Sequence, residues 1–143
     1  MKIRIITVGT PQLSFAKDGI NEYYKRLSRF VNCELHHVKE NKQTDQRIVK
    51  LIEGYECILL DETGKEYTTK ELSRFLEKEK NQSHNLAIII GGPNGHSDEV
   101  GNLSAQSLSL SQLTFPHDLA MMLVLETLYR SFSILENHPY HRD

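Results

Sequence analysis

The sequence predicts an α/β domain built on a mostly parallel five-stranded sheet with helices on both faces. Short apolar runs alternate with longer segments of helical periodicity, which is the order of strand–helix–strand units. The strongest run, LAIII at 86–90, is apolar at every position, as in a strand buried on both faces. The chain has 143 residues, 38% hydrophobic and 25% charged, without a repeat or a linker. We therefore expect a single domain over residues 1–143.

The first half of the chain predicts two strands and two helices. An apolar run at 3–8 stops at Gly9, which indicates a buried strand and a turn. Apolar residues then recur at helical spacing over 12–28, with charged residues on the opposite face. A second strand over 32–38 and a short helix over 45–53 complete this half.

The middle of the chain predicts a strand, a turn and a capped helix. The run ECILL at 56–60 is followed by Asp-Glu-Thr-Gly-Lys at 61–65, which indicates a strand and then a turn. Thr68 and Glu71 have the spacing of a capping box, in which each residue's side chain bonds the other's backbone N–H. The helix that they open is expected to end near Lys80.

The last third predicts a short helix, a strand and a long apolar helix. After the buried strand the sequence GGPNG breaks the pattern, and Ser97 is placed to cap a helix to about Leu103. Residues 107–113 alternate polar and apolar, which favours a fifth strand. Pro116 suits the first turn of a helix that reaches about Leu135 and is about 30 Å long. Its apolar residues cover more than one face, so the sheet would bury one side and a partner subunit another.

Charge and apolar content exclude several classes of protein. The 17 Lys and Arg residues against 19 Asp and Glu residues give a net charge of -2, which is unlike proteins that coat nucleic acid. No run is long enough to span a membrane and no signal peptide is recognisable, so we expect a cytoplasmic protein without a membrane partner. Cys33 and Cys57 lie in apolar runs, far apart, and are expected to be buried reduced thiols.

The loops at the carboxyl ends of the strands are the expected ligand site. In parallel α/β sheets ligands bind outside these ends. The GGPNG loop matches neither a dinucleotide fingerprint nor a phosphate-binding loop, and a simple turn that needs glycine explains it equally well. Together with Leu60 and residues 111–116, however, its glycines would suit a flat heterocycle held by backbone groups.

Other candidate sites receive less support from the residues. His138 and His141 form an HxxH pair, but no cysteine or carboxylate accompanies them at a metal-ligand spacing, and no metal is expected. Glu126 and Arg130 stand four residues apart on an apolar helix. They could form an ion pair in which each charge only neutralises the other, or they could have a functional role.

Several segments together resemble the RlmH family. They are IIIGGPNGHS, SLSLSQLTFPHDLAMMLVLETLYRSFSI and NHPYHRD, and the resemblance extends to KIRIITVGT and LLDETGK, so that it covers nearly the whole chain. RlmH proteins are SPOUT-class methyltransferases that methylate N3 of a pseudouridine in bacterial large-subunit ribosomal RNA. The resemblance implies a C-terminal deep trefoil knot, which an ordinary sheet prediction would not contain.

The resemblance also implies a cofactor, partners and residue roles. S-adenosylmethionine would bind against the knot, at Leu60, Gly91, Gly92, Ser111, Gln112, Leu113, Thr114, Phe115 and Pro116. The protein would be a homodimer in which the tail of one subunit completes the active site of the other. Its substrate would be 23S ribosomal RNA within the ribosome, and not DNA.

The implied catalytic residues are Tyr140, His141 and Arg142, with Arg130 and His117 contacting the substrate. His141 is a candidate general base, but solvent or a phosphate could instead take the proton while His141 positions the target base. Two alternatives stay open. One is a SPOUT methyltransferase with another RNA target, and the other is an inactive relative that binds the cofactor or the ribosome.

Overall fold

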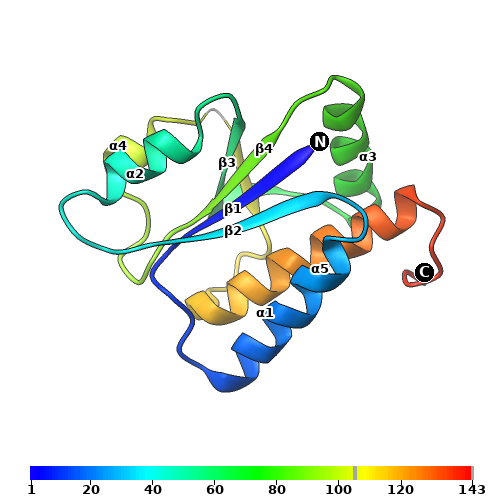
Figure 1. The fold of residues 1–143 in the computed structure, drawn as a ribbon, viewed down its shortest axis with the longest axis horizontal. Helices are drawn as coiled ribbons and strands as arrows, with labels where there is room; N and C mark the ends of the chain where they lie inside the picture. The colour runs from blue at the N-terminus through cyan, green and yellow to red at the C-terminus, as the bar shows by residue number, and fades with distance from the viewer. Residues whose placement is uncertain (105, 143) are drawn as a thin grey trace.

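The computed structural model describes residues 1–104 and 106–142, and its centre is a five-stranded sheet whose strands all run parallel (Figure 1). The strands lie in the order β2-β1-β4-β3-β5. Their bounds are β1 Lys2–Val8, β2 Asn32–Val38, β3 Glu56–Glu66, β4 Leu86–Ile90 and β5 Gln106–Ser109. The predicted parallel sheet is thereby confirmed.

Helices cover both faces of the sheet, also as predicted. Helices α1, α3 and α5 pack on one face, and the shorter α2 and α4 pack on the other (Figure 1). Their bounds are α1 Ser14–Leu27, α2 Thr44–Leu51, α3 Thr69–Asn81, α4 Asp98–Gly101 and α5 His117–Leu135. Among the described residues, no helix combines the length and the apolar character needed to cross a membrane.

Successive side chains of the central strands point to opposite faces of the sheet, so the hydrophobic core has two layers, one on each face. In β1, Ile3 and Ile5 face α1 and α5, whereas Ile6 and Val8 face α2 and α4. Every residue of β4 is buried, because helices cover this strand on both sides. The carboxyl ends of the strands consequently meet at one edge, where the loops that carry the glycines lie.

Two strands differ from the sequence prediction at this edge. The predicted turn at 61–65 is a bulge inside β3, because Leu60 and Lys65 both stand opposite Leu108 of β5. The predicted strand over 107–113 ends at Ser109, whose hydroxyl group donates to the carbonyl oxygens of Glu62 (3.1 Å) and Ser111 (3.0 Å). These bonds turn the chain away from the sheet before α5.

The predicted helix caps are present. The Thr68 hydroxyl accepts from the Glu71 backbone N–H, and the Glu71 carboxylate accepts from the Thr68 N–H, which completes the capping box. The Ser97 hydroxyl likewise accepts from the Val100 N–H at the start of α4. These contacts show why both helices begin where the sequence predicts.

Asp118, in the first turn of α5, fixes the start of α1. Its buried carboxylate accepts from the backbone N–H groups of Gln12 (2.7 Å) and Leu13 (2.8 Å). The N-cap position of α1 is Leu13, whose side chain has no hydrogen-bond acceptor for the first turn. Asp118, which is distant along the chain, instead bonds the backbone N–H groups of Leu13 and of the residue before it. The two helices therefore depend on each other.

We expect Asp118→Asn to lower the free energy of unfolding by about 1.5–3 kcal/mol, because a neutral amide replaces a carboxylate that accepts two buried N–H bonds. Urea unfolding monitored by circular dichroism measures the change. Asp18→Asn, on the exposed face of α1, removes the same charge and should change stability by less than about 0.5 kcal/mol. Equal effects of the two variants would contradict the role given to Asp118.

The two cysteines are free thiols, as predicted; Cys33 is buried as expected, whereas Cys57 is only half-buried. Burial, helped by the charge of Glu34, raises the pKa of Cys33 to about 12. Burial also raises the pKa of Cys57, although a hydrogen bond from Ser104 opposes the shift. Both groups stay protonated near neutral pH, and the thiolate is the reactive form.

We expect alkylation of Cys33 by iodoacetamide at about pH 8 to be at least about tenfold slower in the folded protein than in urea. Cys57→Ser isolates the reaction of Cys33, and mass spectrometry follows it. Because the folded-state pKa is raised, stability should fall as the pH rises above the ordinary thiol value of 9.0. Labelling at the rate of the unfolded chain would show that Cys33 is not buried.

Candidate active site

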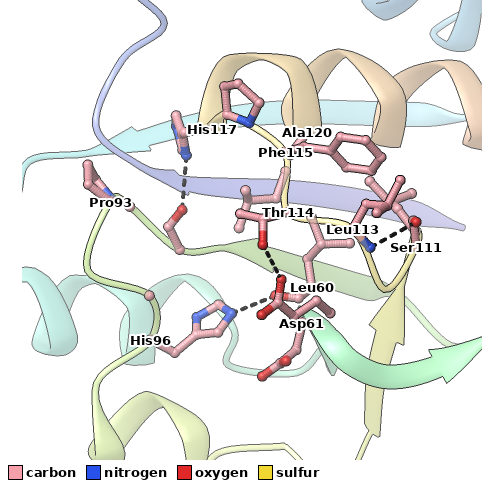
Figure 2. A pocket seen from close by; sticks show the side chains of 17 residues that line it. Leu60, Asp61, Pro93, His96, Ser111, Leu113, Thr114, Phe115, His117 and Ala120 are labelled. Atoms are coloured by element: carbon pink, nitrogen blue, oxygen red, sulfur yellow. Dashed lines mark hydrogen bonds between the residues drawn. The ribbon is translucent and has the colours of Figure 1, made fainter.

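A cavity of about 630 Å³ opens where three chain segments meet at the carboxyl edge of the sheet (Figure 2). The segments are the bulge of β3, the loop after β4 and the loop between β5 and α5. The volume is typical of sites for small organic ligands. The lining residues are Leu60, Asp61, Glu62, Ile90, Gly91, Gly92, Pro93, Gly95, His96, Leu110, Ser111, Leu113, Thr114, Phe115, Pro116, His117 and Ala120.

Glycines give the loop after β4 its shape. A Cβ atom added to Gly91 would lie 2.9 Å from the carbonyl carbon of Gly95 and 3.0 Å from its oxygen, closer than real side chains come. Gly95 itself has a φ of 72°, and it pairs with Gly92 through a bridge. A Cβ on Gly92 would meet the carbonyl oxygen of Val8 at 3.3 Å. The loop thus folds back tightly and leaves its backbone open to the cavity.

Hydrogen bonds between the three segments hold the cavity walls together. The His96 Nε2 lies 2.9 Å from the carbonyl oxygen of Leu60, and the Thr114 hydroxyl donates to the Glu62 carboxylate at 2.8 Å (Figure 2). The Leu113 backbone N–H donates to the Ser111 hydroxyl at 3.0 Å within the third segment. The first two of these bonds join segments that are distant along the chain and fix the walls relative to one another.

His117 lines the cavity, and one of its ring nitrogens is buried. Its Nδ1 lies 2.9 Å from the carbonyl oxygen of Gly91, so Nδ1 carries the proton and donates to it. In the neutral ring Nε2 is then an acceptor, and this atom is buried without a hydrogen-bond partner among the described residues. Buried polar atoms are nearly always bonded, so this ring nitrogen is an exception within the part of the chain that the structure describes.

The cavity combines apolar walls with backbone hydrogen-bonding groups. Leu60, Leu110 and Phe115 supply apolar surface, and the glycine loop supplies exposed backbone groups. This combination suits a flat heterocycle that carries donors and acceptors at its edge, such as a purine. Asp61 adds a negative charge, because bonds from the backbone and hydroxyl of Thr63 lower the pKa of its carboxyl group, with a smaller contribution from His96.

The residues predicted to bind the cofactor lie together in this structure, with one exception. Leu60, Gly91, Gly92, Ser111, Leu113, Thr114, Phe115 and Pro116 all line the cavity, and so does His117. Gln112 does not, because its exposed side chain borders a separate hollow beside the β3 bulge. Gly95 and His96 were not singled out from the sequence, although they belong to a loop that the strand-end rule selects.

The predicted catalytic residues lie elsewhere, at the other end of α5. Tyr140 packs on Tyr129 with ring centroids 4.5 Å apart, and the His141 Nδ1 lies 3.1 Å from Nη1 of Arg130. Thirteen residues of helix separate Arg130 from His117, which corresponds to about 20 Å along the axis. The tail therefore does not reach the cavity of its own chain.

A hydrogen-bonded cluster fixes the tail on α5. Glu126 Oε1 accepts from Arg130 Nε (3.0 Å) and Nη2 (2.7 Å), which confirms the predicted pair, and it also accepts from the Tyr140 hydroxyl (3.1 Å). Burial lowers the pKa of Arg130, but the hydrogen bonds to Glu126 together with the charges of Glu126, Tyr140 and Tyr23 raise it overall. Burial and bonds to Tyr23 and Glu126 raise the pKa of Tyr140, which stays a neutral phenol.

Comparison with protein families extends the likeness to the whole chain. The profile of a family described as "Predicted SPOUT methyltransferase" matches residues 1–141. A protein of Deinococcus radiodurans named "Ribosomal RNA large subunit methyltransferase H" is 40% identical over 145 residues, covering 99% of both chains. A protein of Acetivibrio thermocellus with the same name is 40% identical over 160 residues, covering 99% of this chain and 100% of that one.

Solved structures resemble the fold at low sequence identity. A probable methylase family protein from Haemophilus influenzae superimposes with a TM-score of 0.59 at 16% identity, covering 99% of this chain and 70% of that chain. The TrmH/SpoU tRNA modifying enzyme of A. aeolicus gives a TM-score of 0.53 at 8% identity, with 99% and 81% covered. At such identities the likeness concerns the fold alone.

Proposed function

The chain belongs to the SPOUT methyltransferase family, and from this premise we propose that it methylates N3 of a pseudouridine in 23S ribosomal RNA, with S-adenosylmethionine as methyl donor. Its fold is the α/β knot of that family, in which the chain that forms the parallel α/β sheet is knotted. The reaction would take place on ribosomes, in the cytoplasm.

One observation carries the proposal. Relatives named for methylation of large-subunit ribosomal RNA match this chain at 40% identity from end to end. The match spans 99% of the chain, so it includes the residues of the cavity and those of the tail. The end-to-end match therefore favours ribosomal RNA over another RNA as the target. The fold alone would not distinguish between these two targets.

The cavity fits S-adenosylmethionine in size and in chemistry. Its volume of about 630 Å³ accommodates a nucleoside with an amino-acid side arm. Leu60 and Phe115 would cover the adenine ring, and the backbone of Gly91 and Gly92 would approach the ligand closely. When bound, this cofactor supplies a methyl group made electrophilic by a positively charged sulfur.

The protein's own residues have two tasks in the reaction. The cavity walls must hold the methyl group in line with N3 of the target base, which favours transfer by fixing the approach of the reacting atoms. The tail must help N3 lose its weakly acidic proton and must stabilise the negative charge that develops on the ring. We assign the second task to Tyr140, His141 and Arg142, with Arg130 as their support.

A homodimer would bring these two sets of residues together. Arg130 lies about 20 Å along α5 from His117, and no described residue of the tail lines the cavity of its own chain, so the tail would have to act on a partner's cavity. Apolar side chains are exposed near the start of α1 and in the cavity loop, at Leu13 (43%), Phe15 (59%) and Leu113 (71%). In α5 Met122 is only half-buried. We propose that this surface, across the starts of α1 and α5, is the dimer interface.

The charge balance indicates how the RNA is recognised. The net charge is -2, but residues 17–50 hold eight Lys and Arg against five Asp and Glu. In a dimer, the two copies of this segment would provide a modest basic surface, so that no dedicated RNA-binding domain would be needed. Recognition would therefore depend on the shape of a large, structured substrate, the ribosome.

We expect binding to free RNA fragments to be weak and to fall about tenfold between about 50 and 200 mM salt, because few phosphates are contacted. Filter binding with a 23S rRNA fragment and with intact ribosomes measures the difference. Ribosomes should retain much more of their binding at the higher salt. Tight binding of the isolated fragment at physiological salt would contradict recognition by shape.

Methylation in vitro tests the proposed function. Ribosomes from a strain that lacks the gene are incubated with the protein and radiolabelled S-adenosylmethionine, in parallel with tRNA. The expected result is label in 23S rRNA, at one pseudouridine. Label in tRNA would favour the alternative RNA target, and calorimetric binding of the cofactor without any transfer would indicate an inactive relative.

A further inference from the structure

Three cations lie together where α1 ends. Lys25 and Arg26 belong to the last turn of this helix, and Arg29 follows four residues after Lys25. Arg26 is paired with Glu22, whose carboxylate accepts from its Nε (3.1 Å) and Nη2 (2.9 Å). Lys25 and Arg29 are exposed, and neither side chain has an ion-pair or hydrogen-bond partner in the part of the chain that the structure describes. These two positive charges are therefore available to a ligand from outside.

The tail packs against this end of α1. Phe30 stacks on Tyr129 of α5 with ring centroids 5.7 Å apart, and its ring centroid lies 5.7 Å from that of His138 in the tail. The Arg26 guanidinium lies 5.8 Å from the Tyr129 ring, against which Tyr140 packs. In Figure 1 the end of α1 accordingly lies beside the second half of α5, from which the tail leaves. Each exposed cation directly precedes one of these contact residues in the chain, so both stand close to the tail.

A turn at the end of α5 directs the tail back onto α1. Asn137 has a φ of 56°, the left-handed conformation in which helices often end. The His138 N–H then donates to the carbonyl oxygen of Ser133 (2.8 Å), and the Tyr140 N–H donates to the His138 Nδ1 (3.3 Å). The Tyr140 hydroxyl reaches that of Tyr23 on α1 at 3.4 Å. Hydrogen bonds thus fix the tail relative to the two cations.

We propose that Lys25 and Arg29 bind phosphates of the ribosomal RNA strand that carries the target base, and that this contact aligns the strand with the tail of the same subunit. The inference rests on the proposed function and names the surface that holds its substrate. The two residues contact the RNA away from the reacting atoms. In the proposed dimer the cofactor that meets this tail is bound by the partner, so one subunit would hold the strand while the other supplies the methyl donor.

RNA phosphates match this surface in charge and in chemistry. Lysine and arginine are common phosphate ligands, and their side chains offer only hydrogen-bond donors. The chain as a whole has a net charge of -2, so unpaired cations beside the tail are a local feature and not part of a generally basic surface. Contacts to phosphates set the register of a nucleic acid without reading its sequence. They therefore suit a substrate that is recognised by the shape of the ribosome.

Three other exposed cations, Lys42, Arg47 and Lys50, are less suited to this role. Lys42 borders a hollow of about 270 Å³ together with the carboxylates of Glu40 and Asp45, which would repel phosphates. Arg47 and Lys50 belong to α2, which packs on the face of the sheet opposite to α1 and α5 (Figure 1). The end of α1 is therefore the part of the basic segment that can guide a strand to the tail.

Neutralising the two cations tests the inference. In steady-state methylation of ribosomes, we expect Lys25→Gln/Arg29→Gln to raise KM about tenfold or more and to leave kcat and cofactor affinity within about twofold, because a phosphate contact holds the substrate equally before and during methyl transfer. Arg74→Gln/Lys78→Gln removes an equal charge from exposed positions of α3, also four residues apart, and should leave KM unchanged. No increase in KM, or an equal increase in the two variants, would overturn the inference.

The salt dependence identifies the ligand as phosphate. A fall of about tenfold in the binding of free RNA between about 50 and 200 mM salt corresponds to about two phosphate contacts. Lys25→Gln/Arg29→Gln should therefore bind a free 23S rRNA fragment with a fall of less than about threefold over this range, whereas the α3 variant keeps the full fall. If KM for ribosomes rises but the salt dependence on free RNA is unaltered, the surface contacts an acidic ribosomal protein and the inference is wrong.

Exchanging the two cations separates their charge from their part in the protein's own structure. Lys25→Arg/Arg29→Lys keeps both charges and should keep KM for ribosomes within about threefold of the unaltered protein. An increase of about tenfold in this variant, as large as that expected of the neutral one, would show that charge is not what these positions contribute and would overturn the inference.

Methylation by the unaltered protein decides the proposed function separately. If ribosomes are methylated and KM does not respond to Lys25→Gln/Arg29→Gln, the inference alone fails. If no ribosomal RNA is methylated, the proposed function fails, and the salt dependence of binding to free RNA still shows whether this surface binds phosphates.

Discussion

Replacing Gly91 by alanine is expected to weaken S-adenosylmethionine binding by about 10- to 100-fold, which corresponds to about 1–3 kcal/mol of strain in the loop. The added Cβ would lie 2.9 Å from the carbonyl carbon of Gly95, and both atoms belong to backbone that cannot move aside as a side chain could. The loop must then open, and its opening displaces the carbonyl oxygen to which His117 donates. Isothermal titration calorimetry with the cofactor measures the change.

A matched control exists in the neighbouring helix. Gly101, in α4, has no atom within 4 Å of an added Cβ and no positive φ. Gly101→Ala should therefore bind the cofactor as the unaltered protein does. If Gly91→Ala also binds within about twofold, the loop after β4 is a structural turn and the cofactor lies elsewhere.

Removing the tail's functional groups should have the largest effect on catalysis. We expect the double variant His141→Ala/Arg142→Ala to lose about 100-fold or more of its methylation rate on ribosomes, because it removes donors that face the developing negative charge. Cofactor binding should be unchanged, since the substitutions leave the lining of the cavity intact. Single-turnover rates and calorimetry measure these two quantities separately.

Mixing a cavity variant with a tail variant tests whether the tail acts on the partner subunit, at a cofactor concentration too low to fill the Gly91→Ala cavity. In a heterodimer of Gly91→Ala and His141→Ala/Arg142→Ala, the intact cavity of one subunit meets the intact tail of the other. Random pairing makes half of the dimers mixed, each with one complete site, so about a quarter of the activity should return. No recovery, with heterodimers demonstrated by native mass spectrometry, would show that the tail does not act in trans.

The parallel sheet and its helices could be predicted from the sequence because each element carries its own local signal. The strands at 32–38 and 86–90 begin and end at the predicted residues, and the capping box at Thr68 marks the start of α3. The ends of β3 and β5 were misplaced because they depend on contacts between distant segments. Glu62 holds Ser109 across the sheet edge, and this contact has no signature in either segment.

The cavity could be predicted in outline, and the arrangement of the tail could not. The rule that ligands bind at the carboxyl ends of parallel strands selects the three loops from their sequence alone. The position of Tyr140 and His141 depends instead on Tyr23 and Glu126, which are distant in the sequence and reach the tail through the packing of α1 on α5. The knot, likewise, has no local signal and entered only through the family resemblance.

Mass spectrometry of ribosomal RNA from a strain that lacks the gene tests whether this protein places one methyl group on N3 of a pseudouridine in 23S ribosomal RNA. We expect one pseudouridine to lose a methyl group in this strain and to regain it when the gene is restored, but not when the restored gene carries His141→Ala/Arg142→Ala. Ribosomal RNA with all of its methyl groups intact in the deletion strain would contradict the claim.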